Sequence, residues 1–382
     1  MSNKNMIKEF YNKIVDEFSF HRNSKLIDKT FKRFYNEIKS IDKKRKPNLE
    51  IKKTQKMYLG NLSKSHYVSK KAKEKIDKLN YYYKVNYKME NVDVEIDLLG
   101  VTPSETEQIV LQVYRLLRFL YNYSNTKMKT LKIVLFLNKD EKKITNKYEI
   151  LSPKHINTAV TYACAENGEI FLYRREEWFK VLAHELMHSL CLDFSGLDIK
   201  NLKYNIKKLF NIKSDFELSE TYSEFWATII NSVFISYDIS NSYKKYKENV
   251  IIIIDIEKIF SLYQCVKILK YMKIDKYELL IGNLSHLYEE KTNVFPYYIL
   301  KCIILYKYDN FINTCNKENS PGNPILYYKS PGNLNCFFNY ILNHYQNKDL
   351  MNDFNKMEEI YKNIKMMKLK KTMRMTIFDK FI

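Results

Sequence analysis

The chain has 382 residues, and its 64 lysine and arginine residues against 44 aspartate and glutamate residues give a formal net charge of +20. Hydrophobic residues make up 45% of the chain, which is enough to build a buried core and excludes a disordered protein. Only 7 glycines and 7 prolines are present, which excludes collagen-like and linker-rich architectures and disfavours an all-β fold with many tight turns. We therefore expect a folded protein rich in helices.

Residues 1–90 are predicted to form a basic helical region. Apolar side chains recur at helical spacing from Met6 to Phe18 and again from Leu26 to Ile41. The positive charge of the chain predicts a weak association with nucleic acid through a basic surface, because a field of one sign attracts polyanions. The abundance of lysine, tyrosine and asparagine, typical of an AT-rich genome, is the simpler explanation of the charge.

Residues 91–240 are predicted to form an α+β core. Strand signals lie at 92–98, 131–137, 156–164 and 169–173. Thr102 and Glu105 form a capping box with a proline between them, which predicts a helix after the first strand. Asn167 and Gly168 predict the turn of a hairpin between the last two strands, and a helix is expected to begin near Glu176.

Residues 241–382 are predicted to be helical, because long stretches of the region have apolar side chains at helical spacing. The expected architecture is therefore a small mixed sheet with one central helix, flanked by helical N- and C-terminal regions. The longest apolar stretches are shorter than the 18 or so residues that a membrane-spanning helix needs, so no transmembrane segment is expected.

The cysteines indicate where the protein is located. No CxxC pair occurs, and the six cysteines are scattered at positions 164, 191, 265, 302, 315 and 336. We expect all six to be reduced and most to be buried, as in an intracellular protein. The first residues also lack the apolar segment of a signal peptide, so a secreted protein is not expected.

The most informative segment is His184-Glu185-Leu186-Met187-His188, an HExxH sequence. On a helix the two histidines lie one turn apart on the same face, so both imidazoles can bind one cation, usually Zn²⁺. Glu185 would then act as the general base that takes a proton from a metal-bound water. The alternative is a helix whose histidines only pack, but the apolar neighbours indicate a buried helix, where unpartnered histidines would be costly.

A catalytic zinc site needs a third protein ligand. Metzincins place a histidine where this chain has Phe194, and Asp193 lies one residue short of that position, so that class is disfavoured. Two acidic residues farther along, Glu220 and Glu224, stand four apart on one face of a predicted helix. A capping box of Ser214 and Glu217 would open this helix. The alternative is a solvated acidic helix face.

An HExxH sequence followed by a helix with two acids four residues apart resembles the gluzincin branch of zinc metallopeptidases. The resemblance implies that His184, His188 and Glu220 hold the metal and that Glu224 fixes a ligand histidine. Gluzincins usually have aspartate where this chain has Glu224, so either glutamate remains a candidate for the third ligand. Residues 155–235 are also similar to HExxH proteins of large DNA viruses, which implies a cytoplasmic location, in association with a virus or its host cell.

The leading hypothesis is a gluzincin-like enzyme that hydrolyses peptide bonds with Zn²⁺, acting on a peptide or protein that binds along the strand before the central helix. A further histidine, or a tyrosine such as Tyr222, Tyr297 or Tyr298, would stabilise the oxyanion. Two alternatives remain: an inactive binding protein that keeps the zinc, and a protease associated with nucleic acid. The substrate cannot be read from the sequence.

Overall fold

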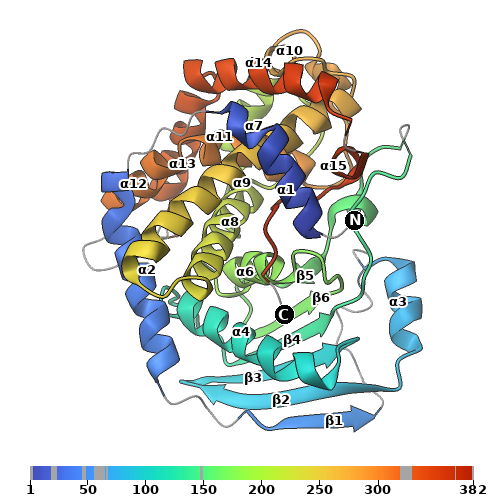
Figure 1. Ribbon diagram of the computed structural model, residues 1–382, viewed down its shortest axis with the longest axis vertical. Helices are drawn as coiled ribbons and strands as arrows, with labels where there is room; N and C mark the ends of the chain where they lie inside the picture. The colour runs from blue at the N-terminus through green and yellow to red at the C-terminus, as the bar shows by residue number, and fades with distance from the viewer. Residues whose placement is uncertain are drawn as a thin grey trace.

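A computed structural model describes residues 3–18, 24–44, 49–55, 65, 68–146, 149–318, 329–365 and 367–380. It combines one mixed β-sheet with many helices, so the predicted α+β class is confirmed. Figure 1 shows the sheet at one end of the molecule and most of the helices at the other. No helix in the described part of the chain is both long enough and apolar enough to cross a bilayer.

The sheet has six strands in the order β1-β2-β3-β4-β6-β5. Their bounds are β1 Ile51–Gln55, β2 Tyr81–Met89, β3 Val92–Leu99, β4 Thr130–Phe136, β5 Ala159–Thr161 and β6 Asn167–Leu172. Strands β3, β4 and β6 run parallel to one another, whereas β1, β2 and β5 run antiparallel to their neighbours. The short strand β5 therefore ends the sheet, next to the part of the chain that leads into the HExxH helix.

Both faces of the sheet are covered, as the alternation along β4 shows. Ile133 and Leu135 pack into the main core, whereas Val134 and Phe136 pack into a smaller cluster beneath helix α3. Successive side chains of a strand point to opposite faces, so an unbroken apolar run is expected for a strand buried on both sides. Helices α4 and α6 pack on the main-core face (Figure 1).

The helices of the first half of the chain lie at both ends of the molecule: α3 and α4 lie beside the sheet, whereas α1 and α7 lie among the other helices (Figure 1). Their bounds are α1 Asn3–Lys13, η1 Val15–Glu17, α2 Ser24–Lys43, α3 Lys70–Asp77, α4 Pro103–Tyr121, α5 Pro153–Ile156, α6 Trp178–Ser189 and α7 Lys200–Phe210. Helix α4 begins at the predicted capping box: the Thr102 backbone N–H donates to Glu105 Oε2 at 2.8 Å. The prediction of a helix after the first predicted strand is therefore confirmed.

The second half of the chain is helical, as predicted. Its elements are α8 Leu218–Asp238, α9 Tyr243–Tyr271, α10 Tyr277–Ile281, η3 Ser285–Leu287, the π-helix η4 Phe295–Leu300, α11 Lys301–Tyr306, α12 Tyr308–Glu318, α13 Pro331–His344, α14 Lys348–Asn363 and α15 Met367–Lys371. Helix α8 packs on both α6 and α9, so it connects the sheet end of the molecule with the helical end.

The N-terminal region differs from its prediction, because strands β1 and β2 lie within residues 1–90. Strand β2 pairs with β3 from Tyr83 opposite Leu98 to Met89 opposite Val92, so the sheet extends into the region that was expected to be helical throughout. Every second side chain from Tyr83 to Met89 is buried, the period of a strand with one face on a core.

The last described segment of the chain returns to the start of α6 (Figure 1). The backbone N–H groups of Met375 and Thr376 donate to Glu177 Oε1 at 2.7 and 2.6 Å, and the N–H of Glu177 donates to Asp379 Oδ1 at 3.1 Å. Glu177 precedes the first residue of α6. The C-terminal segment thus helps to hold the beginning of the HExxH helix in place.

Candidate metal centre

Helix α6 carries the HExxH sequence in a buried environment. All twelve of its residues are buried, from Trp178 to Ser189. His184 and His188 are one turn apart, their ring centroids are 4.7 Å apart, and their two Nε2 atoms are 3.0 Å apart. The helical spacing therefore brings the same nitrogen of each ring to one point.

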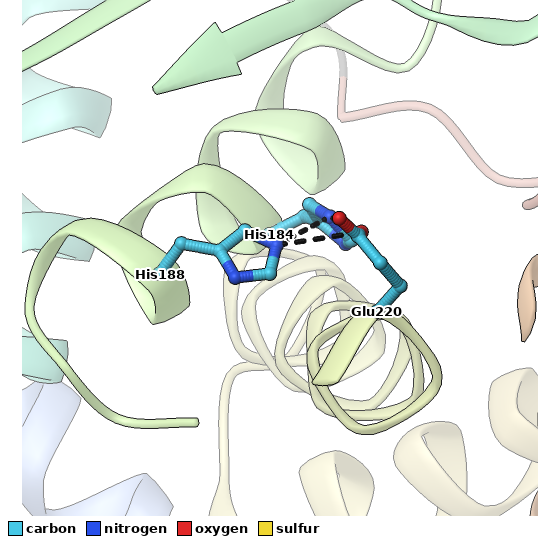
Figure 2. Close-up of side chains that lie close together, drawn as sticks. All are labelled: His184, His188 and Glu220. Carbon is cyan, nitrogen blue, oxygen red and sulfur yellow. Dashed lines mark hydrogen bonds and ion pairs between the residues drawn. The ribbon is translucent and has the colours of Figure 1, made fainter. Parts of the chain in front are cut away.

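Helix α8 supplies a carboxylate to the same point. Glu220 Oε2 lies 3.0 Å from His184 Nε2 and 3.4 Å from His188 Nε2. Figure 2 shows the Glu220 side chain reaching from α8 toward the two imidazoles. One ligand atom from each of these three residues lies within 4.8 Å of the others, and this is the one such group among the described residues.

Glu224, one turn after Glu220, contacts the other ring nitrogen of His184. Its Oε2 lies 3.2 Å from His184 Nδ1, the ring nitrogen that faces away from His188 Nε2. Its other oxygen, Oε1, pairs with the buried ammonium group of Lys180 and lies 3.8 Å from that of Lys301. The two glutamates therefore take different positions: Glu220 on the side where the histidines converge and Glu224 on the opposite side of His184.

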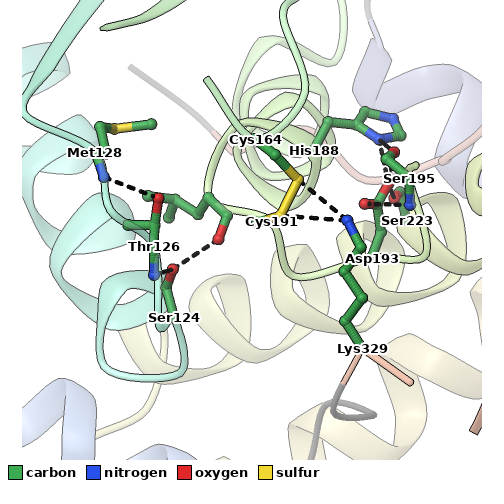
Figure 3. The surroundings of a disulfide bond; sticks show 11 residues. Ser124, Thr126, Met128, Cys164, His188, Cys191, Asp193, Ser195, Ser223 and Lys329 are labelled. Atoms are coloured by element: carbon green, nitrogen blue, oxygen red, sulfur yellow. Dashed lines mark hydrogen bonds and ion pairs between the residues drawn. A yellow bond between two sulfur atoms is a disulfide. The ribbon is translucent and has the colours of Figure 1, made fainter. Parts of the chain in front are cut away.

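Asp193 contacts the second histidine in the same manner. It lies in the loop after α6, and its carboxylate hydrogen-bonds with His188 Nδ1 (Figure 3). The Ser195 backbone N–H donates to Asp193 Oδ1 at 3.0 Å, and the hydroxyls of Ser195 and Ser223 donate to Oδ2 at 2.8 and 3.3 Å. Each histidine thus has a carboxylate at Nδ1, which fixes the ring and leaves Nε2 for a metal.

The converging atoms face a cleft of about 440 Å³. Strand β5 forms one wall with Ala159, Val160 and Thr161. The beginning of α8, residues 291–293 and Tyr297 of η4 also line the cleft.

Two further side chains with possible roles in catalysis, Glu185 and Tyr297, line the cleft with the three converging residues. Glu185 lines the cleft and is 8% exposed. The Tyr297 hydroxyl donates to Glu220 Oε2 at 2.7 Å, also from within the cleft. Of the other two tyrosines considered as oxyanion donors, Tyr222 is fully buried and the Tyr298 hydroxyl donates to the Met373 carbonyl, so neither lines this cleft.

The three glutamates differ in their electrostatic state. Burial raises the pKa of the Glu185 carboxyl, and the nearby histidines oppose this only in part. Burial also opposes ionisation of Glu220, but His188 and His184 outweigh it and hold its pKa well below the usual range. For Glu224, burial is likewise outweighed, here by Lys180 and His184, which lower its pKa to about 2. Two of the carboxylates are therefore ionised, and the third accepts a proton more readily than an ordinary glutamate.

A disulfide bond joins the two segments that flank the histidines (Figure 3). It links Cys164, in the turn between β5 and β6, to Cys191, which follows α6, and both sulfurs lie 3.3 Å from the Lys329 ammonium group. The prediction that all six cysteines are reduced is wrong for this pair. Cys265, Cys302 and Cys315 are buried, as predicted. The argument from reduced cysteines for an intracellular location therefore no longer applies.

Loss of this disulfide should lower the free energy of unfolding by about 3 kcal/mol, because the bond closes a loop with a sequence separation of 27 residues. Guanidinium unfolding of a Cys164→Ser/Cys191→Ser variant, beside the oxidised wild type, measures the difference. The wild type treated with a dithiol reductant should match the variant. Equal stability of the variant and the oxidised wild type would contradict the prediction.

Two local predictions around the site are wrong. Asn167 and Gly168 lie in strand β6, and the turn of the hairpin comes before them. Gly168 is closely packed instead: a Cβ there would lie 2.8 Å from Met128 Cε, so the end of that side chain would have to shift. The capping box of α8 is also absent: Ser214 Oγ accepts from the Glu290 N–H at 3.1 Å, and Glu217 pairs with Lys203 at 3.0 Å.

The sequence did not reveal two residues of the site. Asp193 was considered only as a metal ligand, although the Asp-x-Ser pattern just after the helix is typical of an aspartate held in a turn. Lys180, one turn before His184, was overlooked. A lysine on an apolar helix face indicates no role by itself, and its buried partner, Glu224, lies on another helix.

Comparison with known proteins adds no assignment: no family model, curated protein or solved structure matches the chain.

Proposed function

We propose that the protein is a zinc-dependent metallopeptidase with a zincin-like core and gluzincin-type metal ligands. The observation that carries the proposal is the convergence of His184, His188 and Glu220 at the floor of a cleft bordered by an edge strand. The donor set fits the metal, because two imidazole nitrogens and one carboxylate oxygen are a typical set of protein ligands in catalytic zinc sites. When bound there, zinc would supply a water of lowered pKa and polarise the scissile carbonyl.

Glu185 is the proposed general base. It lies in the cleft beside both histidines, and its raised pKa suits a group that first accepts a proton from the attacking water and then delivers it to the leaving amine nitrogen. Glu224 and Asp193 keep the two imidazoles oriented, because each places a carboxylate oxygen next to an Nδ1 atom. Glu224 Oε2 lies 3.2 Å from that of His184, and Asp193 hydrogen-bonds with that of His188.

Substrate binding is assigned to β5 and Tyr297. Strand β5 pairs with β6 along one edge, and its residues line the cleft, so its other edge can hydrogen-bond an extended peptide. The Tyr297 hydroxyl is the proposed donor to the oxyanion that forms when the peptide carbonyl is attacked.

Catalysis is favoured over a purely structural zinc site. A structural site has four protein ligands, whereas a catalytic one keeps a position for water. Among the described residues, Asp193 and Glu224 contact the histidines at Nδ1, away from the point of convergence, and no fourth His, Cys, Asp or Glu side chain joins the three proposed ligands.

Metal analysis of the purified protein tests the proposal. The wild type should contain stoichiometric zinc and cleave peptides from an unstructured protein such as casein, whereas His188→Ala should lose both properties. His286→Ala is the matched control, because His286 is exposed and contacts only the Asn283 carbonyl in the described structure. Zinc binding by His188→Ala at the wild-type level would refute the ligand assignment.

A further inference from the structure

A second cavity, of about 450 Å³, lies at the carboxyl ends of the parallel strands β4 and β6. Lys139 follows β4 and Arg174 follows β6, while Lys71 near the start of α3 and Lys154 of α5 complete its walls. None of the described residues that line this cavity also lines the candidate catalytic cleft. In open sheets with parallel strands, ligands often bind outside the carboxyl ends of the strands.

Arg174 is the unusual residue of this cavity. It is only 5% exposed, and its Nη2 donates to the Lys154 carbonyl at 2.6 Å. Its Nη1 is buried without a hydrogen-bond acceptor, and no carboxylate of the described residues lies within 4.0 Å of the guanidinium. A buried charge is costly unless it is paired with an opposite charge. An anion bound in the cavity would compensate the guanidinium of Arg174.

The rest of the lining is also positively charged. Four lysines line the cavity beside Arg174, against two acidic residues, Asp140 and Glu141. The acidic residues are themselves paired: Asp140 lies 3.0 Å from the Lys71 ammonium and 2.8 Å from that of Lys75, and Glu141 lies 3.8 Å from that of Lys143. Lys154 pairs with Glu149 at 2.9 Å. Neither acidic pair reaches Arg174, and Lys139 has no acidic partner among the described residues.

We propose that this cavity binds the phosphate group of a small molecule. A guanidinium presents parallel N–H donors that match two phosphate oxygens, and Lys139 adds a second cation that has no acidic partner among the described residues. The volume lies within the range of small-molecule sites, so a ligand of the size of a mononucleotide fits better than a polymer. The proposal is independent of the metal centre.

Thermal unfolding and titration calorimetry with inorganic phosphate test the proposal, at an ionic strength held constant with sodium chloride. Phosphate should raise the midpoint of wild-type unfolding saturably, because a ligand that binds only the folded state stabilises it. Arg174→Met should weaken phosphate binding by about 10- to 100-fold, the usual effect of losing hydrogen bonds to a charged group. A parallel titration with a nucleoside monophosphate distinguishes free phosphate from a phosphate ester, and tighter binding of the ester identifies the larger ligand.

Two further variants decide the outcome even if Arg174→Met does not fold. Lys139→Gln removes an exposed cation of the cavity and should weaken phosphate binding by about threefold. Lys78→Gln makes the same change at the C-terminal end of α3, outside the lining, and should leave binding unchanged. Equal midpoints in phosphate and chloride, or equal phosphate affinity of Lys139→Gln and Lys78→Gln, would overturn the proposal.

Discussion

Replacing Glu185 by glutamine should reduce peptide hydrolysis by about a thousandfold while leaving zinc bound. Glutamine has nearly the same shape but cannot accept the proton of the attacking water. The three proposed ligands are unchanged by the substitution, and Glu185 is not among the three residues whose donor atoms converge. The measurement combines the rate of cleavage of an unstructured protein with the zinc content of the same sample.

The control for this experiment is Glu166→Gln, which makes the same change on the surface. Glu166 pairs with Lys129 at 2.8 Å, and both side chains are mostly exposed, so its loss should alter neither activity nor metal content. If Glu185→Gln cleaves peptides at the wild-type rate, the proposed role of Glu185 is wrong. If it loses zinc, its effect on activity has another cause.

Lys180→Met should lower both the stability of the fold and the affinity for zinc. Lys180 and Glu224 form an ion pair in which both side chains are nearly inaccessible to solvent. Removing the ammonium group takes away the closest cation of Glu224 and leaves Lys301 at 3.8 Å and His184 Nδ1 at 3.2 Å, so we expect a loss of about 3 kcal/mol in the free energy of unfolding. Because Glu224 also orients His184, zinc should bind about 10- to 100-fold more weakly.

A double variant separates the two effects. Lys180→Met/Glu224→Gln leaves no uncompensated carboxylate, so it should recover most of the stability but not the zinc affinity. Lys307→Met is the matched control, because it breaks a partly exposed pair with Asp349 and should cost less than about 1 kcal/mol. Denaturant unfolding and zinc titration measure the two quantities. Equal stability and equal zinc affinity of Lys180→Met and Lys307→Met would contradict the prediction.

The sequence was most informative where chemistry depends on local spacing. Two histidines four residues apart on a helix must share a face, and two glutamates four apart must do the same, so the donors now found together could be nominated in advance. The structure adds that Glu220 contacts Nε2 of His184 and that Glu224 contacts its Nδ1. That distinction depends on how α8 packs against α6, and no local pattern encodes it.

The features that the sequence missed depend on contacts between distant segments. The disulfide partners are separated by 27 positions, and nothing in their surroundings distinguishes them from the other four cysteines. Gly168 resembled a turn residue, but it lies in a strand, where the side chains of Met128 and Leu131 approach its backbone closely. Strand β2 alternates as a strand should, yet its many tyrosines and lysines obscured the alternation.

The contact between the C-terminal segment and Glu177 has a consequence for synthesis. The ribosome delivers the chain from its N-terminus, and the hydrogen bonds that secure the start of α6 come from residues 375, 376 and 379. The start of α6 therefore cannot form these hydrogen bonds until about 190 more residues have been translated after the helix. Until these residues have been synthesised and have left the ribosome, the nascent chain lacks the contacts that hold the start of α6.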